Sequence, residues 1–487
     1  MRRTPITIAL LCAAMLAACL GLSAGASASS RQVTIMQDDG LLIRSGDSTQ
    51  AATLDEFQKL GVDVVKVQVY WGEIAPKGSK KPSGFDATNP EGYNWHDYDG
   101  IVRGAVARGM QPYLVLGNRA PAWASKSGGK HNGTYRPSAK ELALFAQAAG
   151  TRYSGNYAGL PRVSIWSIWN EPNLSSWLGP QRTKGGTPLS PSIYRNLYLA
   201  GHKGLAASGH AGDKILLGEL APRGRGSDKV PPLTFLREVA CLNSRYRAYR
   251  GKAAKARGCP SKLGRIPTSG IAYHPYTPSQ GGPRAKIRSD EASIATLGRI
   301  SRVSDRIASH GRLSKHVSVW VSEFGFQTDP PDPFQNPIKK VPGYMDESEW
   351  RAFRNSRVAS YSQYTLHDDA LNPGGKFSLS RYAGFQMGLR FSNGKAKPGV
   401  YSAFRLPAFV RLLSGNRVEV FGGLRTSPGA TATVSSARPG GKYSVLAQPK
   451  LNSAGYFRFI RKVSSASERK YKISIGGFSR TKRPARR

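Results

Sequence analysis

Short apolar runs alternate with longer amphipathic stretches over most of the chain, from about residue 31 to residue 410. Apolar runs bounded by turn residues are typical of buried strands, whereas apolar positions at helical spacing predict helices. The predicted strands are Val33–Met36, Val64–Val69, Pro112–Leu116, Val163–Trp169, Ile215–Gly218, Gly270–Tyr273, Val317–Val321 and Ala383–Met387. The predicted helices between them include Leu54–Leu60, Ile101–Arg108, Lys140–Tyr153, Tyr194–Ala207, Leu233–Cys241 and Ile294–His310.

This alternation predicts an α/β fold with parallel strands. Eight strand and helix units that close on themselves form a (β/α)8 barrel, or TIM barrel, which we expect over residues 29–410. A doubly wound open sheet is the alternative, but no glycine-rich phosphate-binding loop follows the first predicted strand. In a barrel, functional side chains are expected at the C-terminal ends of the strands.

After Phe409 the pattern changes to short alternating runs separated by turn residues. This change predicts a small antiparallel β-sandwich over residues 411–479. Residues 411–487 carry 17 Lys or Arg against 2 Asp or Glu, hence a net charge of +15. The last residues, 480–487, are predicted to form a disordered basic tail.

Residues 1–28 have the pattern of a secretory signal peptide: two arginines, an apolar run from Ile6 to Leu22, and Ala-Ser-Ala at the end. We expect this segment to be removed and the mature protein to be secreted. The residues before Cys19 also fit a bacterial lipoprotein cleavage box, so lipid anchoring at Cys19 is the alternative. No later segment has about 18 consecutive apolar residues, so no membrane span is expected.

Two cysteines, Cys241 and Cys259, lie outside the predicted signal peptide. A cysteine pair in an exported chain predicts a disulfide, because the thiols meet an oxidising environment. This disulfide would close a short basic loop and contribute about 3 kcal/mol to stability through loop entropy. Two buried free thiols are the alternative.

The whole chain has a formal net charge of +41. In an exported protein, such a charge favours binding to anionic cell-wall polymers, acidic polysaccharides or membrane surfaces. Binding to nucleic acid is not expected, because the chain has no zinc finger, RNA-binding signature or aromatic-interleaved basic motif. Part of the charge is explained equally well by a solvated surface.

The fourth predicted strand is aromatic and ends in Asn170 and Glu171, followed by a proline. Partial burial at the mouth of a barrel raises the pKa of a carboxyl group towards the working pH, which suits a proton donor. A simple strand-ending turn would also explain this sequence. The seventh predicted strand repeats the arrangement, because it ends in Glu323 followed by a glycine.

Strands four and seven lie on opposite sides of a barrel mouth, so Glu171 and Glu323 can face each other across a cleft. The two motifs resemble those of clan A glycoside hydrolases, the retaining (β/α)8 superfamily that includes families five and thirty-nine. The resemblance covers roughly residues 31–410 and implies that Glu171 is the general acid/base and Glu323 the nucleophile. Asn170 would bind the sugar 2-hydroxyl. Retaining enzymes hold the two carboxyl groups about 5–5.5 Å apart and react by double displacement.

Other residues at the predicted strand ends are candidates for substrate binding. Similar enzymes often have a His and a Tyr after strand six, where His274 and Tyr276 lie, and the Tyr hydroxyl holds the nucleophile ionised. A core histidine with packed tyrosines is the alternative. Glu219, after strand five, could contact sugar hydroxyls or cap a loop. Trp71 and Trp123 could stack on a sugar ring, although each could equally be a packing residue.

Two departures from the resembling family are visible. Family members often carry an Arg on strand two near the nucleophile, whereas this chain has Lys66, which lacks the bidentate fork of an Arg. Many members also have a Trp after strand eight that forms the floor of the sugar subsite. The stretch predicted to match it, 385–388, contains no Trp.

The sequence therefore predicts a secreted retaining glycoside hydrolase that acts on a β-linked carbohydrate substrate, with the +15 module as an anchor to anionic polymers. We expect no cofactor and no metal ion. A non-catalytic carbohydrate-binding or cell-wall-binding protein is the alternative, although such a protein would be expected to have lost one of the two glutamates. A transglycosylase using the same site is a further alternative.

Overall fold

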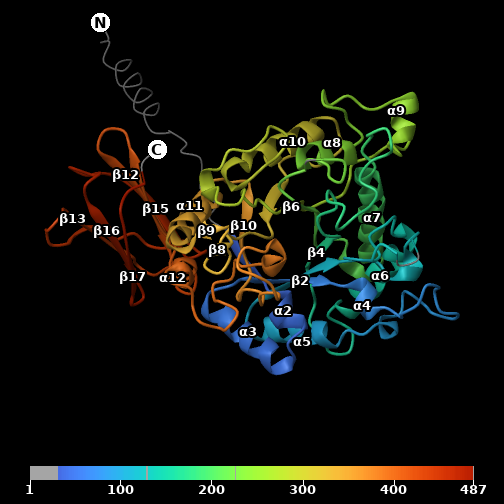
Figure 1. Ribbon diagram of the computed structural model, residues 1–487, viewed down its shortest axis with the longest axis horizontal. Coiled ribbons are helices and arrows are strands. Elements are labelled where there is room, and N and C mark those ends of the chain that lie inside the picture. Colours follow the sequence, from blue (N-terminus) through green and yellow to red (C-terminus); the bar gives the residue numbers. More distant parts are fainter. Residues whose placement is uncertain (1–30, 128–129, 225, 486–487) are drawn as a thin grey trace, which may run out of the picture.

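The computed structural model describes residues 31–127, 130–224 and 226–485, which form a barrel and a smaller β-sandwich beside it (Figure 1). The predicted signal peptide, with its candidate lipidation site Cys19, lies outside the described residues. Within these ranges, none of the helices has the length and apolar character that a membrane crossing requires.

Eight parallel strands close into a barrel in the order β1-β10-β7-β6-β5-β4-β3-β2. Their bounds are β1 Val33–Gln37, β2 Val64–Val69, β3 Gln111–Leu116, β4 Ile165–Ile168, β5 Lys214–Leu220, β6 Gly270–Tyr273, β7 Ser318–Val321 and β10 Val358–Tyr364. The predicted barrel is confirmed, and the open-sheet alternative is excluded by the hydrogen bonds between β1 and β10.

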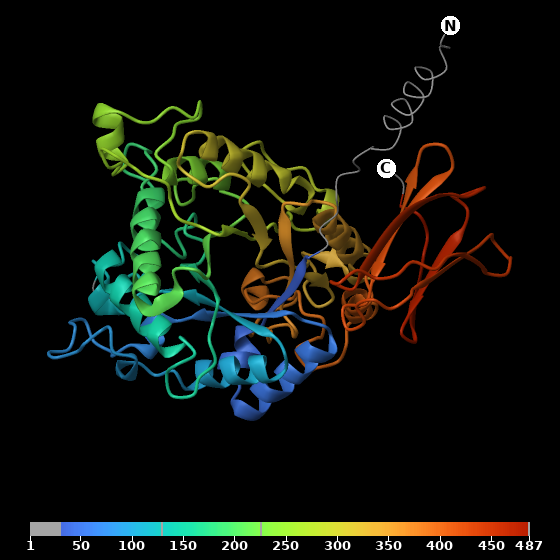
Figure 2. The ribbon, with the colours of Figure 1, turned by 180° about the vertical axis from the view of Figure 1, so that it is seen from behind.

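Helices surround the barrel, as expected for strands that are buried on both faces (Figure 2). The longer ones are α3 Asp47–Lys59, α5 His96–Ala107, α6 Ala139–Arg152, α7 Ser190–Leu205, α8 Pro232–Val239, α10 Gly298–Ser309 and α11 Val341–Phe353. Shorter helices include α2 Asp39–Ile43, α4 Trp71–Ile74, α9 Gly251–Ala256 and α12 Val400–Arg405. The pair β8 Thr328–Asp329 and β9 Asn336–Pro337 lies in the loop after β7.

The position of the eighth strand differs from the prediction. It is β10, Val358–Tyr364, whereas the predicted strand Ala383–Met387 has no strand residues. The strand β10 was missed because it is polar in sequence although it is buried. Its Ser360 and Ser362 are fully buried. Their hydroxyls donate hydrogen bonds to the carbonyls of Val321, at the end of β7, and Ser322, directly after it, at 3.0 and 3.2 Å.

The sandwich consists of a sheet β11-β12-β15 and a sheet β14-β13-β16-β17. The strands are β11 Ala408–Leu413, β12 Arg417–Gly423, β13 Thr433–Ala437, β14 Ser444–Ala447, β15 Tyr456–Lys462, β16 Lys470–Ile475 and β17 Phe478–Lys482. The predicted sandwich is confirmed. The predicted disordered tail is wrong at its start, because residues 480–482 belong to β17.

Helix α11 joins the barrel to the sandwich through buried charges. Its Asp346 accepts hydrogen bonds from Arg480 at 2.6 and 2.9 Å, and its Glu349 accepts a hydrogen bond from Arg425. Both acids are about 1% exposed. The start of the predicted basic tail is therefore held in place by an acid of the barrel.

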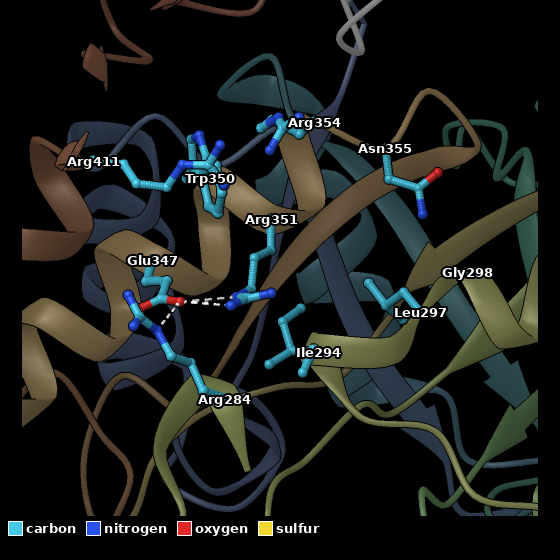
Figure 3. A pocket seen from close by; sticks show the side chains of 11 residues that line it. Arg284, Ile294, Leu297, Gly298, Glu347, Trp350, Arg351, Arg354, Asn355 and Arg411 are labelled. Atoms are coloured by element: carbon cyan, nitrogen blue, oxygen red, sulfur yellow. Dashed lines mark hydrogen bonds and ion pairs between the residues drawn. The ribbon is translucent and has the colours of Figure 1, made fainter. Parts of the chain in front are cut away.

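A cavity of about 400 Å³ lies at this junction. Figure 3 shows Glu347 of α11 between Arg284 and Arg351, and it accepts hydrogen bonds from both at 2.7 Å. Trp350, Arg354 and Arg411 line the same cavity. Each of the four arginines has an acidic or aromatic neighbour, and the lining residues come from both parts of the molecule, with Arg411 from the sandwich.

The predicted disulfide is confirmed. Cys241 and Cys259 are bonded and link the chain just after α8 to the residues that follow α9. The alternative of two free thiols is therefore excluded.

Candidate active site

Glu171 lies directly beyond the C-terminal end of β4, in a turn with unusual backbone geometry. Trp169 and Glu171 have φ angles of +68° and +36°, which are rare for residues other than glycine and are concentrated at functional sites. The backbone N–H of Glu171 donates to the carbonyl of Glu219 at 2.9 Å, which ties the turn to β5. The side chain of Glu171 remains 15% exposed at the mouth of the barrel.

Two ring nitrogens hold the carboxyl group of Glu171. Nδ1 of His274 lies 2.9 Å from Oε1, and the indole N–H of Trp177 donates to Oε2 at 3.2 Å. Trp177 follows β4 in the same loop, so it is brought to the carboxyl group by the local turn. This arrangement fixes the direction of the carboxyl group while leaving it open to the cleft.

Glu323 lies two residues beyond the end of β7 and is 9% exposed at its side chain. The Tyr276 hydroxyl donates to its Oε1 at 3.0 Å. Its Oε2 lies 3.5 Å from both Lys66 Nζ and His274 Nε2. These contacts hold the carboxyl group of Glu323 in one orientation at the edge of the cleft.

Glu219 occupies the centre of the site and does not reach its opening. It was expected at the mouth, but β5 extends through Leu220 and the Glu219 side chain is fully buried. It does not line the cleft. Its carboxylate accepts hydrogen bonds from the following five side chains: Lys66 at 2.9 Å, Ser167 at 2.9 Å, Ser322 at 2.8 Å, His274 at 2.7 Å, and Tyr113.

The electrostatics around Glu219 explain how a buried charge is tolerated. Burial raises the pKa of Glu219, but the charge of Lys66 and the hydrogen bond from His274 outweigh burial and lower this pKa overall. For Lys66, burial lowers the pKa, whereas the charges of Glu219 and Glu323 raise it overall. Glu219 is therefore an ionised carboxylate that lies beneath the cleft and accepts hydrogen bonds from several side chains around it.

His274 lies between Glu219 and the two candidate catalytic glutamates and contacts all three. Burial alone would lower its pKa, but the charge of Glu323 and the hydrogen bonds to Glu171 and Glu219 outweigh burial and raise the pKa to about 9. At neutral pH both ring nitrogens then carry protons and act as donors. His274 is buried, so it orients the carboxyl groups from below the cleft.

The two glutamates line one cleft with a volume of about 970 Å³. Asn170 and Tyr276 line it as well. The Oδ1 atom of Asn170 is buried and has no hydrogen-bond partner in the described part of the chain. An unpaired buried carbonyl is costly, so this atom is a ready acceptor for a hydroxyl group of a bound ligand.

The two tryptophans predicted as sugar platforms lie away from the cleft. Trp71 is fully buried. Its ring stacks on Phe145 with 5.3 Å between the ring centroids and packs edge-to-face with Trp123 with 5.9 Å between the centroids. The indole of Trp123 donates to the carbonyl of Pro76 at 2.9 Å. Trp71 is thus part of the packing between the barrel and its helices, whereas Trp123 is half-buried and lines a different cavity from the one that holds the two glutamates.

Other aromatic residues take their place. Tyr70, Trp177, Tyr364 and Phe385 line the cleft. Tyr70 and Trp177 could be found in the sequence as neighbours of predicted strands, but no local pattern favours them over Trp71. Tyr364 was missed because the strand that ends with it was missed. The aromatic residue directly at the end of the eighth strand is therefore Tyr364, where the resembling family often has a Trp.

No family model and no curated protein matches the sequence. Solved structures do match. A family 39 glycoside hydrolase from the gut symbiont Bacteroides cellulosilyticus WH2 aligns over 89% of this chain and 81% of its own length, with 15% identity and a TM-score of 0.50. At this identity the likeness shows a shared fold, which is the fold that the sequence resemblance implied.

Two further structures align with lower TM-scores. A β-glucuronidase from Bacteroides uniformis aligns over 94% of this chain and 46% of its own length, with 10% identity and a TM-score of 0.45. A family 5 glycoside hydrolase from Bacteroides vulgatus aligns over 91% of this chain and 89% of its own, with 13% identity and a TM-score of 0.43.

Proposed function

We propose that this protein is a retaining glycoside hydrolase that cleaves a β-linked glycan, with Glu171 as general acid/base and Glu323 as nucleophile. One observation carries the proposal: the two glutamates line the same cleft at the C-terminal ends of β4 and β7, and each is held by its own donors. Paired carboxyl groups on either side of the scissile bond are what this reaction requires.

In the first step, a carboxylate oxygen of Glu323 attacks the anomeric carbon of the sugar. The bond from that carbon to the leaving oxygen breaks, and Glu171 transfers its proton to the leaving oxygen. The product is a glycosyl ester on Glu323. The hydroxyl of Tyr276 donates to Glu323 before the attack, which aims the carboxylate at the sugar.

In the second step, Glu171 removes a proton from water while the water oxygen attacks the anomeric carbon. The ester bond breaks and Glu323 leaves as a carboxylate, so the configuration of the anomeric carbon is retained. Asn170 is assigned to the sugar hydroxyl next to the anomeric carbon, because its buried Oδ1 has no other partner among the described residues.

Lys66, Glu219 and His274 support these steps from below without touching the sugar. With Lys66 and His274 cationic, Glu219 and Glu323 anionic, and Glu171 protonated, the cluster is neutral. In the first step Glu323 loses its charge on forming the ester while Glu171 gains one, so the cluster stays neutral. The new carboxylate of Glu171 lies 2.9 Å from Nδ1 of the His274 imidazolium, which stabilises it. Lys66 takes the place of the Arg that the resembling family often has.

We first test the two glutamates separately with a panel of activated aryl glycosides. Glu171→Ala and Glu323→Ala are each expected to lower turnover by at least about a hundredfold, the low end of what a positioned catalytic group contributes. Azide is expected to restore part of the turnover of Glu323→Ala, with inverted configuration in the product. Glu468→Ala, which changes an exposed glutamate of the sandwich, serves as the control. Near-normal turnover of Glu323→Ala would falsify the assignment.

We infer that the mature protein is exported, because the structure contains the disulfide Cys241–Cys259, and stable disulfides are typical of oxidising compartments. Expression of the full chain with a C-terminal tag tests this inference. The tagged protein is expected outside the cytoplasm and shortened by about the length of the predicted signal. An unshortened chain retained in the cytoplasm would contradict it.

A further inference from the structure

One wall of the cleft carries four cationic side chains: Arg223, Lys229, Lys286 and Arg288. The first two lie between β5 and α8, and the other two lie between β6 and the short helix Ile294–Thr296. Three of these four residues are exposed, and Lys229 is half-buried. Neighbouring strands of the barrel thus place all four cations on adjacent loops.

These cations are largely unpaired within the described part of the chain. Arg223, Lys286 and Arg288 have neither an ion pair nor a side-chain hydrogen bond there, and Lys229 has only Asp228 at 4.0 Å. This distinguishes them from the arginines around Glu347, which are paired with that acid. The wall therefore presents positive charge to whatever occupies the cleft.

Apart from the two candidate catalytic residues, the cleft has one acid, Glu291, which is 5% exposed. Its carboxylate accepts hydrogen bonds from the backbone N–H groups of Gly224 and Arg288, both at 3.4 Å. Glu291 thus joins the two cationic loops to each other. Among the described residues, Glu291 forms no ion pair with the four cations.

Among the described residues, the rest of the cleft lining carries no other cation. Apart from the three glutamates, it consists mainly of amide, apolar and aromatic side chains, among them Gln68, Tyr70, Gln327, Tyr364, Phe385 and Met387. All four cations of the lining come from the two loops after β5 and β6, which are neighbouring strands, so the positive charge of the cleft is concentrated on one side.

We propose that the substrate is an anionic glycan, in which a sugar carrying a carboxylate, sulfate or phosphate group contacts the wall formed by Arg223, Lys229, Lys286 and Arg288. This inference rests on the proposed glycosidase function and names its substrate class. Guanidinium and ammonium groups at the rim bind such oxyanions directly, and their summed field raises the local concentration of a polyanion.

The test measures binding separately from turnover. An array of neutral gluco-, xylo- and manno-oligosaccharides and of uronate, sulfated and phosphorylated oligosaccharides is probed with Glu171→Gln at low salt. We expect signals from anionic glycans, and the class that binds identifies the substituent. Adding Lys286→Ala and Arg288→Ala is expected to weaken binding about tenfold or more, equivalent to about 1.4 kcal/mol. Adding Lys59→Ala and Arg103→Ala removes the same charge from the exposed faces of α3 and α5 and is expected to leave binding unchanged.

Binding of neutral glycans alone, or no binding at all, would overturn the proposal. An equal loss in both double variants would overturn it too, because the effect would then come from the overall charge of the surface. Failure here is distinguishable from failure of the proposed function. If a neutral aryl glycoside is hydrolysed and Glu323→Ala abolishes the hydrolysis, the glycosidase assignment stands and only the substrate class is wrong.

Discussion

At the scale of single residues, the site depends on a buried proton. His274 contacts Glu171 and Glu219 at 2.9 and 2.7 Å, and it lies 3.5 Å from Glu323. The buried carboxylate of Glu219 would lose part of its compensating charge if that ring were neutral. The imidazolium and Lys66 together stabilise it.

This charge predicts how stability depends on pH. The pKa of His274 is raised from 6.5 to about 9 by folding, so the folded state binds this proton more tightly than the unfolded state. The resulting stabilisation is complete below pH 6.5 and is lost as the pH rises through 9. A shift of this size corresponds to about 3 kcal/mol in the free energy of unfolding.

Urea unfolding between pH 6 and pH 10 measures this effect. The difference in the free energy of unfolding between the wild type and His274→Gln is expected to shrink by about 3 kcal/mol over that range. His131→Gln, which replaces an exposed histidine, is the control and is expected to show no such trend. A difference between wild type and His274→Gln that stays constant with pH would contradict the proposed role of the buried proton.

At the scale of elements, the end of β5 determines where Glu219 points. Gly218 has a φ angle of +128° and Glu219 one of +55°, and the pairing of β5 with β6 shifts register between Gly218 and Leu220. Such a bulge re-aims a side chain, here towards the interior of the barrel. Only a glycine adopts the backbone of Gly218 without strain.

Gly218→Ala is therefore expected to disturb both stability and the site. A Cβ at this position would lie 2.4 Å from the carbonyl oxygen of Ala272 in β6, and the positive φ adds strain of about 1–3 kcal/mol. We expect a lower melting temperature together with reduced turnover, because Glu219 would be displaced from Lys66.

Gly212→Ala is the matched control. It lies just before β5, and a Cβ there would meet no atom within 4 Å. Its melting temperature and turnover are expected to be close to those of the wild type. If Gly218→Ala behaves like Gly212→Ala, the bulge does not position Glu219.

The elements also explain which parts of the fold could be predicted from sequence. Strands such as β2 and β6 are apolar runs bounded by turn residues, and their predicted bounds are the observed ones. The strand β10 could not be found in this way, because it contains polar serines. These serines can be buried because their hydroxyls donate hydrogen bonds to backbone carbonyls at the end of β7. That pairing depends on the closed barrel, which no local pattern contains.

The same limit applies to the site. Glu171 and Glu323 could be found because each follows an apolar aromatic run and ends a strand. The inward direction of Glu219 depends on a bulge of two residues, and the burial of Trp71 depends on helix α6, which supplies Phe145. The residues adjacent in sequence do not reveal how neighbouring strands are in register or how distant elements pack. Properties that depend on these features therefore could not be predicted.

At the scale of the whole molecule, buried ion pairs hold the barrel and the sandwich together. In each pair the acid comes from α11 and the arginine from the C-terminal part of the chain. Asp346 and Glu349 of α11 are about 1% exposed, and their partners Arg480 and Arg425 come from the sandwich and the loop after β12. An uncompensated buried charge costs about 3–5 kcal/mol. Removing residues 411–487 would take away the partners of both acids and would expose the apolar side chains of Trp350 and Phe353, which pack against Phe421 and Tyr456, so the truncated barrel is expected to be less stable.

The role of the sandwich as an anchor must therefore be tested by substitution. Lys470 and Lys472 are exposed, lie two residues apart on β16 and face the same side of its sheet. If the basic sandwich binds anionic polymers, the double variant Lys470→Gln and Lys472→Gln should bind bead-coupled teichoic acid more weakly than the wild type. Its affinity should also depend less on salt concentration, because exposed charges attract a polymer through a field that salt screens. Lys252→Gln with Lys255→Gln on α9 removes the same charge from the barrel and is expected to leave binding unchanged. Equal binding by all three proteins at low salt would show that the sandwich is not an anchor, and its place against α11 would then be explained by stability alone.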